Sequence, residues 1–496
     1  MKKKYIIFSI VTLVLLVSFL SYSKYLKTTN VCKEDVKPTK ITKGISMNLE
    51  QTAGAGDYKQ VTQSNWPTEG YEFNAELSKC ENGSTLSWDD TKKAVIVSGN
   101  TSDKCYVYFD KLLVLSEVCG DKTLKDCVIA QYTGTQGQNN IYYHKSSLSN
   151  GAGDNSYRYA GGDYQLTSKA ISAGFNSITT KSQTSTDGVV NYYCNGTKQY
   201  VGAGCPGNYI SYYSLQYDTT NTQYQSYKEA LEKAIVDGYL IEDKVENFVC
   251  FGTNESTCST DNLYRIIGMI DNKVKLIKYD CASRNLLGTT GESPYNRSPF
   301  STYQGALTSI DLYHINSGGN PINDWSLSPL NKTNLNTSFI NNIGTTWASK
   351  IITTTWKVGG GVPTNIIESV PKIAYQYEVG SSASTTTYDA KIGLMYVSDY
   401  YYSASPSAWT LVGYNSDYTK SYASAKGENW LYGGGWEWTI SRNSGNSIGA
   451  FYVNDYGGVG SDFVDGSYGV RPSFSLLSST TYVSGSGSMS DPVRIN

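Results

Sequence analysis

The sequence predicts a β-rich α+β protein in three parts: an N-terminal membrane helix, a small β-sandwich domain and a larger C-terminal α+β module. The first part is predicted by one apolar run near the N-terminus. The other two are predicted by many short segments in which apolar and polar residues alternate, joined in the last part by a stretch of helical period. With 496 residues, 39% of them apolar, the chain can form two or three hydrophobic cores.

The N-terminal segment 1–23 has the features of a membrane anchor. Three lysines precede an apolar run over residues 5–20, and basic residues in this place hold the N-terminus in the cytoplasm. We expect an uncleaved anchor followed by a linker over 24–38, so that the chain is a single-pass protein of the cell membrane with an extracellular C-terminal region. The alternative is a secreted protein, because Ser21 and Ser23 are small residues at which a signal peptidase could cut.

Residues 39–112 are predicted to form the β-sandwich. Two segments alternate well, 94–97 and the strand that begins at Cys105. In the second, Cys105, Val107 and Phe109 would face one way and the intervening tyrosines the other. The length fits a small antiparallel sandwich of the immunoglobulin-like type, whose expected role is to hold the next module away from the membrane.

The rest of the chain divides into a loop-rich connecting region over 113–245, with one helix over 222–236, and an α+β head over 246–496. Alternation near the C-terminus puts Trp436 and Trp438 in the core of the head. Within the head we expect, in order, a β-hairpin over 263–277, a helix over 335–350, a buried strand over 392–397, and strands over 436–440 and 470–476.

Ten cysteines support export, because closely spaced pairs of this kind form disulfides outside the cytoplasm. Cys32 and Cys281 are left over, and spacing does not fix the connectivity. No Cys-x-x-Cys or His-x-x-x-His spacing occurs, so we expect no metal site and no cofactor. The expected structural pairs are Cys80 with Cys105, Cys119 with Cys127, Cys194 with Cys205, and Cys250 with Cys258.

Composition argues against several functions. The chain has only two histidines, His144 and His314, against 43 tyrosines, so imidazole-based catalysis has few candidates. Its net charge is −2 and charged residues make up 17%, which is too little positive charge for nucleic-acid binding. Tyrosine offers flat amphipathic surface, and the balance favours binding over catalysis.

Six short motifs follow one another along the chain. They are N-S-Y-R-Y-A-G at 155–161, N-F-V-C-F-G at 247–252, N-L-Y-R-I-I-G at 262–268, K-I-G-L-M-Y-V-S-D-Y at 391–400, W-E-W-T-I-S at 436–441 and Y-G-V-R-P-S-F-S-L at 468–476. Together they resemble large uncharacterised exported proteins of gut Firmicutes and their wall-less relatives, whose C-terminal module ends in a G-V-R-P signature. The resemblance covers most of the chain after residue 55 and implies that 162–245 is an insertion, but it assigns no activity.

The C-terminal module is also distantly similar to the fold shared by formylglycine-generating enzymes and C-type lectins. Gly469, Val470 and Arg471 match its closing strand. The resemblance implies a C-type-lectin-like head without the oxidation chemistry, because no cysteine follows Cys281, and without the calcium motifs of sugar-binding lectins. From its place in an alternating strand, we expect Arg471 to fix a loop through a carboxylate or backbone carbonyls.

The predicted binding segment is 430–468, which combines tyrosines and asparagines with glycine turns, as adaptable binding surfaces do. We expect non-catalytic recognition or adhesion at the cell surface, with an extracellular glycan or protein as partner. The oligomeric state is left open. The surface candidates are Arg442, Asn443, Tyr452, Asn454, Tyr456 and Asp465.

Two other functions compete with recognition. One is a hydrolase of extracellular polysaccharide that uses two carboxylates. The other is a structural, pilin-like surface subunit. The acidic residues that could supply the hydrolase pair are Asp399, Glu437, Asp455, Asp462 and Asp465.

Overall fold

The computed structural model separates into two compact units, Met1–Leu112 and Leu113–Asn496. The first unit ends where the sequence predicts the end of the β-sandwich. The predicted anchor, linker and helix over 222–236 lie outside the described residues, as do Cys32, Cys194, Cys205 and His314. The residues described in full are 44–62, 65–67, 70–89, 92–99, 103–162, 245–290, 315 and 321–496, with the backbone of short strands between 165 and 241.

The chain is mixed α+β and rich in strands that form small sheets. Among the described residues, no helix combines the length and the apolar character needed to cross a bilayer.

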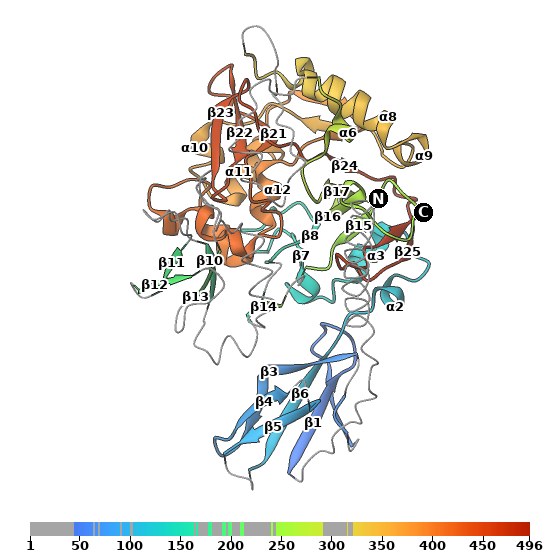
Figure 1. Ribbon diagram of the computed structural model, residues 1–496, viewed down its shortest axis with the longest axis vertical. Coiled ribbons are helices and arrows are strands. Elements are labelled where there is room, and N and C mark those ends of the chain that lie inside the picture. The colour runs from blue at the N-terminus through green and yellow to red at the C-terminus, as the bar shows by residue number, and fades with distance from the viewer. Residues whose placement is uncertain are drawn as a thin grey trace, which may run out of the picture. The chain divides into compact units, whose positions relative to one another are not determined.

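The first unit contains a four-stranded sheet and a separate hairpin (Figure 1). Alternation in the last strand is confirmed: Cys105, Val107 and Phe109 are at most 1% exposed, while Tyr106 and Tyr108 are partly exposed. The core lies between Phe109 and its sheet neighbours on one side and Val95 of the hairpin on the other. The sheet order is β2 (Tyr58–Val61), β1 (Ile45–Glu50), β6 (Cys105–Lys111) and β3 (Tyr71–Cys80), and the hairpin is β4 (Thr85–Asp89) with β5 (Ala94–Ser98).

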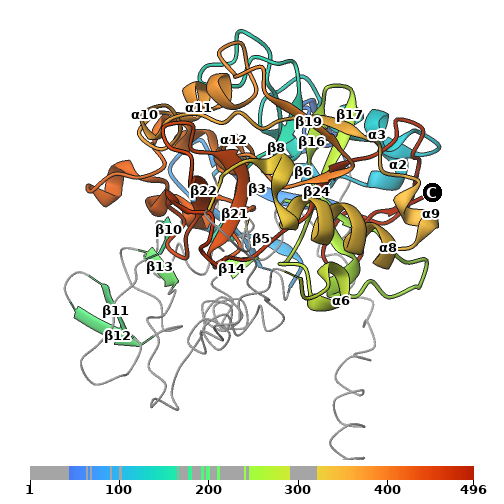
Figure 2. The same cartoon turned by 90° about the horizontal axis from the view of Figure 1, so that it is seen from above.

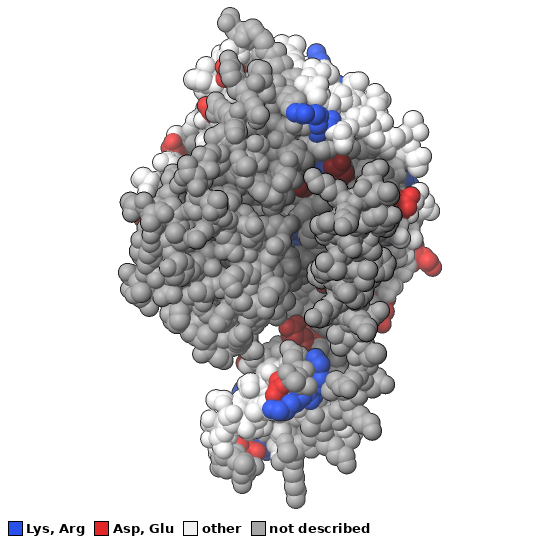
Figure 3. Space-filling model, viewed as in Figure 1, with Lys and Arg blue, Asp and Glu red and all other residues white. Residues whose placement is uncertain are grey.

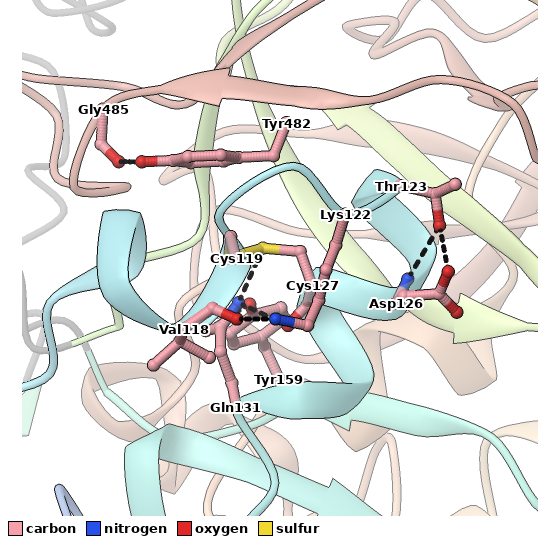
Figure 4. The surroundings of a disulfide bond; sticks show 10 residues. All are labelled: Val118, Cys119, Lys122, Thr123, Asp126, Cys127, Gln131, Tyr159, Tyr482 and Gly485. Carbon is pink, nitrogen blue, oxygen red and sulfur yellow. Dashed lines mark hydrogen bonds between the residues drawn. A yellow bond between two sulfur atoms is a disulfide. The ribbon is translucent and has the colours of Figure 1, made fainter.

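Three of the four predicted disulfides are confirmed: Cys80–Cys105, Cys119–Cys127 and Cys250–Cys258. The first joins neighbouring strands β3 and β6 at directly opposed residues. The second joins α2 (Leu115–Cys119) to α3 (Leu124–Ala130), as Figure 4 shows. Cys281 is buried with a free thiol.

The second unit is built around a seven-stranded sheet. Its predicted hairpin is confirmed, and its turn residues Asp271 and Asn272 have φ of 48° and 60°, which suit the tight type I′ turn. Every residue of β16 before the last is buried, because the sheet is covered on both faces. The strand order is β20 (Ile392–Gly393), β24 (Ser473–Ser475), β17 (Lys273–Lys278), β16 (Leu263–Ile270), β8 (Tyr157–Tyr159) and β7 (Ile141–Tyr143), with β15 (Phe248–Cys250) also paired to β16.

The proposed division between a connecting region over 113–245 and a head over 246–496 is wrong for residues 113–162. These residues supply β7, β8, α2 and α3, and their apolar side chains join the same hydrophobic core as those of the head. The reason is that β8 pairs with β16, a long-range contact that the local composition of a Gly- and Asn-rich segment does not reveal.

Two predictions within the head are wrong in part. The predicted helix over 335–350 begins earlier, as a π-helical stretch at Leu330–Phe339, and is interrupted at Gly344, whose φ is 81°. The predicted strand over 392–397 ends at Gly393, because α12 begins at Val397.

Figure 2 shows α8 beside α6 and α9. The helices here are α6 (Arg284–Leu287), α8 (Ile340–Asn342), α9 (Thr345–Ala348), α10 (Pro363–Ile366), α11 (Pro371–Glu378) and α12 (Val397–Tyr402).

The remaining strands form small sheets around this core. Trp438 and Ile440 are buried as predicted, whereas Trp436 is only half-buried. The small sheets are β21 (Glu437–Arg442) with β22 (Gly449–Val453) and β23 (Val459–Phe463), β18 (Thr354–Lys357) with β19 (Thr387–Ala390), and β25 (Tyr482–Ser484) with β26 (Arg494–Ile495). The expected strand over 470–476 is present as β24, Ser473–Ser475.

Candidate functional site

A cavity of about 160 Å³ lies in the second unit, among β17, β18, α11 and α12. It combines aromatic rings with buried charges, which is the usual character of a ligand site. Its lining residues are Arg158, Ile270, Asp271, Lys273, Lys275, Thr354, Thr355, Trp356, Lys357, Tyr375, Val379, Tyr396, Ser398, Asp399 and Ser475.

A buried ion network forms one wall of the cavity. Lys275 Nζ donates to Asp399 Oδ2 at 2.5 Å, and Arg158 Nη1 donates to Asp399 Oδ1 at 3.3 Å. The side chains of Lys275, Arg158 and Asp399 are 8%, 3% and 3% exposed. We refer to these three residues as the Asp399 cluster. One carboxylate therefore stabilises two cations that water can hardly reach.

The fold places the cluster through three separate elements. Arg158 lies in β8 and Lys275 in β17, two strands of the same sheet. Asp399 lies in the first turn of α12, where its Oδ2 also accepts the backbone N–H of Tyr396 at 2.9 Å. This capping bond fixes the carboxylate against the helix terminus and leaves its orientation little freedom.

Polar partners behind the wall hold Arg158 in place. Its Nε donates to Ser156 Oγ at 2.8 Å, and its Nη2 donates to Asp154 Oδ2 at 2.9 Å. Burial alone would raise the pKa of Asp154, but Arg158 and Ser156 hold it well below its usual range. Burial alone would lower the pKa of Arg158. The charges of Asp154 and Asp399 outweigh burial, so the pKa of Arg158 is raised above its usual value.

Aromatic rings beside Lys275 also line the cavity. Lys275 Nζ lies 5.4 Å from the ring centre of Trp356 and 4.8 Å from that of Tyr396, within cation–π range. Trp356 packs against Gly393, where an added Cβ would lie 2.8 Å from the ring, so a side chain at this position would displace the indole. The Tyr396 hydroxyl accepts the Lys357 N–H at 2.9 Å, which fixes the second ring.

Two carboxylates near the cavity already have partners within the protein. Glu378 lies close to Asp399, and burial raises its pKa, but it does not line the cavity. Its oxygens instead accept the N–H groups of Val397 and Ser398, at 3.0 and 2.8 Å, and the hydroxyl of Ser441. Glu378 therefore caps α12, and Asp399 is held by Lys275 and Arg158.

The predicted surface candidates do not form one binding face. Asn443 is 5% exposed, and its Oδ1 accepts the Gly445 N–H at 2.9 Å, so it holds the turn after β21. Asn454 Oδ1 accepts the N–H groups of Tyr456 and Gly458, both at 2.9 Å, and holds the turn after β22. These two asparagines are structural.

The surface candidates are separated because they lie in turns at opposite ends of the β21–β22–β23 sheet. Successive turns of a short antiparallel sheet alternate between its two ends, so Arg442 and Asp465 lie at the end opposite to Asn454 and Tyr456. Arg442 is half-buried and Asp465 is exposed. Alternation of apolar and polar residues in one strand shows which side chains face the core. It does not show which turns lie at the same end of the sheet.

Tyr452 is the candidate that gathers other aromatic rings. It stacks on the half-buried Trp436 with ring centres 5.0 Å apart, and Tyr468 lies 5.0 Å from it. The Tyr468 hydroxyl donates to Asp462. The expected core role of Trp436 is therefore only partly met, because its ring supports Tyr452 at the edge of the core.

Arg471 fixes loops, as expected. Its Nε donates to Glu437 Oε2 at 2.8 Å, and its Nη2 donates to the Leu431 carbonyl at 2.5 Å. The carboxylates considered for hydrolysis are thus spread over different environments. Glu437 is paired with Arg471, Asp399 is in its cluster, Asp462 accepts from Tyr468, Asp455 is buried and Asp465 is exposed.

Sequence reasoning missed the cavity. The feature of the sequence that best indicates the cavity is Lys275, because this lysine lies between the apolar residues Val274 and Leu276 in a predicted strand. A charge in such a position must find a partner when the strand is buried. Arg158, between two tyrosines in β8, carries the same signal. Neither residue shows which carboxylate it meets.

Charge on the described surface has no dominant sign on the face in Figure 3, where basic and acidic side chains lie close together. Within the described residues, no group of three or more His, Cys, Asp or Glu side chains could hold a metal ion. No family model matches the sequence, and searches of curated proteins and of solved structures found no similar protein. The family resemblance therefore stays a prediction.

Proposed function

We propose that this protein is a non-catalytic recognition protein of the bacterial cell surface, and that its head binds a glycan in the cavity beside the Asp399 cluster. The observation that carries the proposal is the cavity itself, in which fixed charges face aromatic rings. Sugars are recognised by this combination, because their C–H faces stack on rings while their hydroxyls bond to polar groups.

Binding is favoured over hydrolysis by the state of the carboxylates. A glycosidase needs one carboxyl group that can donate a proton and a second that can act as base or nucleophile. Of the two acidic residues that line the cavity, Asp399 is paired with Arg158 and Lys275, and Asp271 lies exposed in the hairpin turn. This arrangement can orient a ligand, but it does not pair a carboxyl acid with a carboxylate base as a glycosidase does.

The proposal includes the finer architecture. Residues 1–23 would anchor the chain in the membrane, 39–112 would form an immunoglobulin-like stalk, and the second unit would be a C-type-lectin-like head. The three disulfides support an extracytoplasmic location, because such bonds persist in oxidising compartments. Protease protection of the chain in intact cells would test the topology, which requires the second unit to be accessible from outside.

A glycan array and an extracellular-protein array probed with the full-length chain test the function. Val379→Phe would fill the cavity, since Val379 lines it. Val483→Phe is the matched control, because Val483 is 56% exposed and does not line the cavity. We expect wild type and the control to retain the same glycans, and Val379→Phe to lose them.

Mass spectrometry of the bound glycans separates the rival functions. Recovery of the intact glycan after prolonged incubation supports recognition. Release of shortened products would establish a hydrolase instead. Binding that survives in Val379→Phe would place the ligand elsewhere on the molecule and overturn the assignment of the cavity.

A further inference from the structure

The charges that line the cavity are unbalanced. Four basic side chains face two acidic ones there: Arg158, Lys273, Lys275 and Lys357 against Asp271 and Asp399. Asp154 lies behind the wall and pairs with Arg158, which still leaves one positive charge in excess. A cation at a cavity shielded from water is stabilised when an anion enters, so the site is suited to an anionic group.

Unused hydrogen-bond donors lie at the same place. An ammonium group has three N–H donors, and in the described part of the chain only Asp399 accepts one from Lys275. A guanidinium has five, and Arg158 uses three of them, toward Ser156, Asp154 and Asp399. A carboxylate has acceptor sites enough to bond both cations at once.

The cavity also has the size and the walls for a single ring. Its volume of about 160 Å³ is close to that of a cavity that admits one benzene ring. The rings of Trp356 and Tyr396 line the cavity beside Lys275 Nζ and offer apolar contact, and Ser475 brings a hydroxyl group to the lining for a ligand hydroxyl. A free carboxylate of acetate size would leave most of this space empty.

We propose that the cavity binds the carboxylate-bearing pyranose ring of an acidic saccharide, with the carboxylate at Lys275 and Arg158 and the ring against Trp356 and Tyr396. The inference rests on the proposed function and names its ligand class. A uronic-acid terminus has this chemistry.

Isothermal titration of the full-length chain with methyl glucuronide, methyl glucoside and acetate tests the proposal. We expect the glucuronide to bind at least about tenfold more tightly than either of the other two, because charge-assisted bonds add to ring stacking. Lys275→Met should remove this preference. Lys278→Met is the matched control: Lys278 lies on the same strand, is 1% exposed and donates to the Thr260 carbonyl at 2.7 Å, outside the cavity.

A second variant keeps the test valid if Lys275→Met does not fold. Lys357 lines the cavity but is only half-buried, so Lys357→Gln should fold and reduce the preference for glucuronide about threefold. Unchanged preference in both Lys275→Met and Lys357→Gln would overturn the proposal.

The outcomes distinguish a failure of the acidic-saccharide proposal from a failure of the proposed glycan recognition. Equal binding of glucoside and glucuronide, both blocked by Val379→Phe, would refute the acidic ligand and leave glycan recognition standing. Acetate binding as tightly as glucuronide would refute the role of the ring. If no saccharide binds, on the array or in titration, the proposed function is refuted as well.

Discussion

Arg158 and Arg265 are buried arginines in neighbouring strands of one sheet, but their surroundings differ. Arg265 is 1% exposed and lies between the rings of Phe248 and Trp430, with its Cζ 4.1 and 4.6 Å from the ring centres. Its guanidinium donates to neutral groups: Asn247 Oδ1 at 2.6 Å and the carbonyls of Val245 and Trp430 at 2.8 and 3.3 Å. Arg158 is instead held by two carboxylates beside a cavity.

The difference shows two uses of a buried charge. Arg265 ties three segments of backbone together and has rings on both faces, so it stabilises the fold. Arg158 also lies near two rings, with its Cζ 5.7 and 5.6 Å from the ring centres of Tyr375 and Tyr402. It differs from Arg265 in sharing Asp399 with a second cation beside the cavity, an arrangement that costs solvation free energy. Such a cost is understandable where the charges meet a ligand. We therefore assign Arg265 to stability and the Asp399 cluster to binding.

Replacing Arg265 should have the largest effect on stability. Arg265→Met leaves the Asn247, Val245 and Trp430 acceptors without their donor, so we expect the free energy of unfolding to fall by about 4 kcal/mol. Arg265→Lys keeps the charge but loses the planar fork, and about 2 kcal/mol should be lost. Urea unfolding followed by tryptophan fluorescence measures both. A loss below that of Arg265→Lys in the methionine variant would contradict the structural role.

Replacing Asp399 should come next. Asp399→Asn leaves Lys275 and Arg158 close together without their shared anion, and we expect a loss of about 3 kcal/mol. The control is Asp389→Asn, because Asp389 is exposed and accepts the Thr355 hydroxyl at the surface, so its effect should stay within about 0.5 kcal/mol. Equal effects of the two variants would show that the cluster is not held by Asp399.

Acid should destabilise the region around Arg158. His144 is fully buried, and burial together with the charge of Arg158 lowers its pKa from 6.5 to about 3. The unfolded chain therefore binds a proton in the interval between these values while the folded chain does not, so stability is lost as the pH falls below 6.5. At pH 5 the loss from this group is about 2 kcal/mol.

The variant His144→Gln isolates this contribution. Its unfolding free energy, measured from pH 7 to pH 5, should fall less steeply than that of wild type by about 2 kcal/mol. Parallel pH profiles in the two proteins would show that His144 titrates normally and is not buried beside Arg158.

Lys275→Met should have the smallest effect on stability, about 1 kcal/mol, although it is the most damaging to binding of acidic saccharide. Methionine keeps the apolar stem against Trp356. Asp399 keeps Arg158 and the Tyr396 N–H as partners. A loss as large as that of Arg265→Met would mean that Lys275 serves the fold, and the distinction between the two regions would fail.

The sequence predicts the features that depend on residues close together in the chain, and it does not predict those that depend on distant residues. The hairpin around Asp271 and Asn272, the alternation in β6 and the three disulfides depend on neighbours in sequence, and the sequence predicts them. The cavity depends on β8 meeting α12, which brings together Arg158 and Asp399, 241 residues apart. Periodicity indicates that a charged side chain lies in a buried strand, but it does not identify a partner so far away in the sequence.

A crystal structure of the full-length protein soaked with methyl glucuronide would show whether the Asp399 cluster binds the sugar. We expect the sugar ring in the cavity against Trp356, with its carboxylate within hydrogen-bond distance of Lys275. A sugar bound on the Trp436–Tyr452 rings with the cavity empty would contradict it.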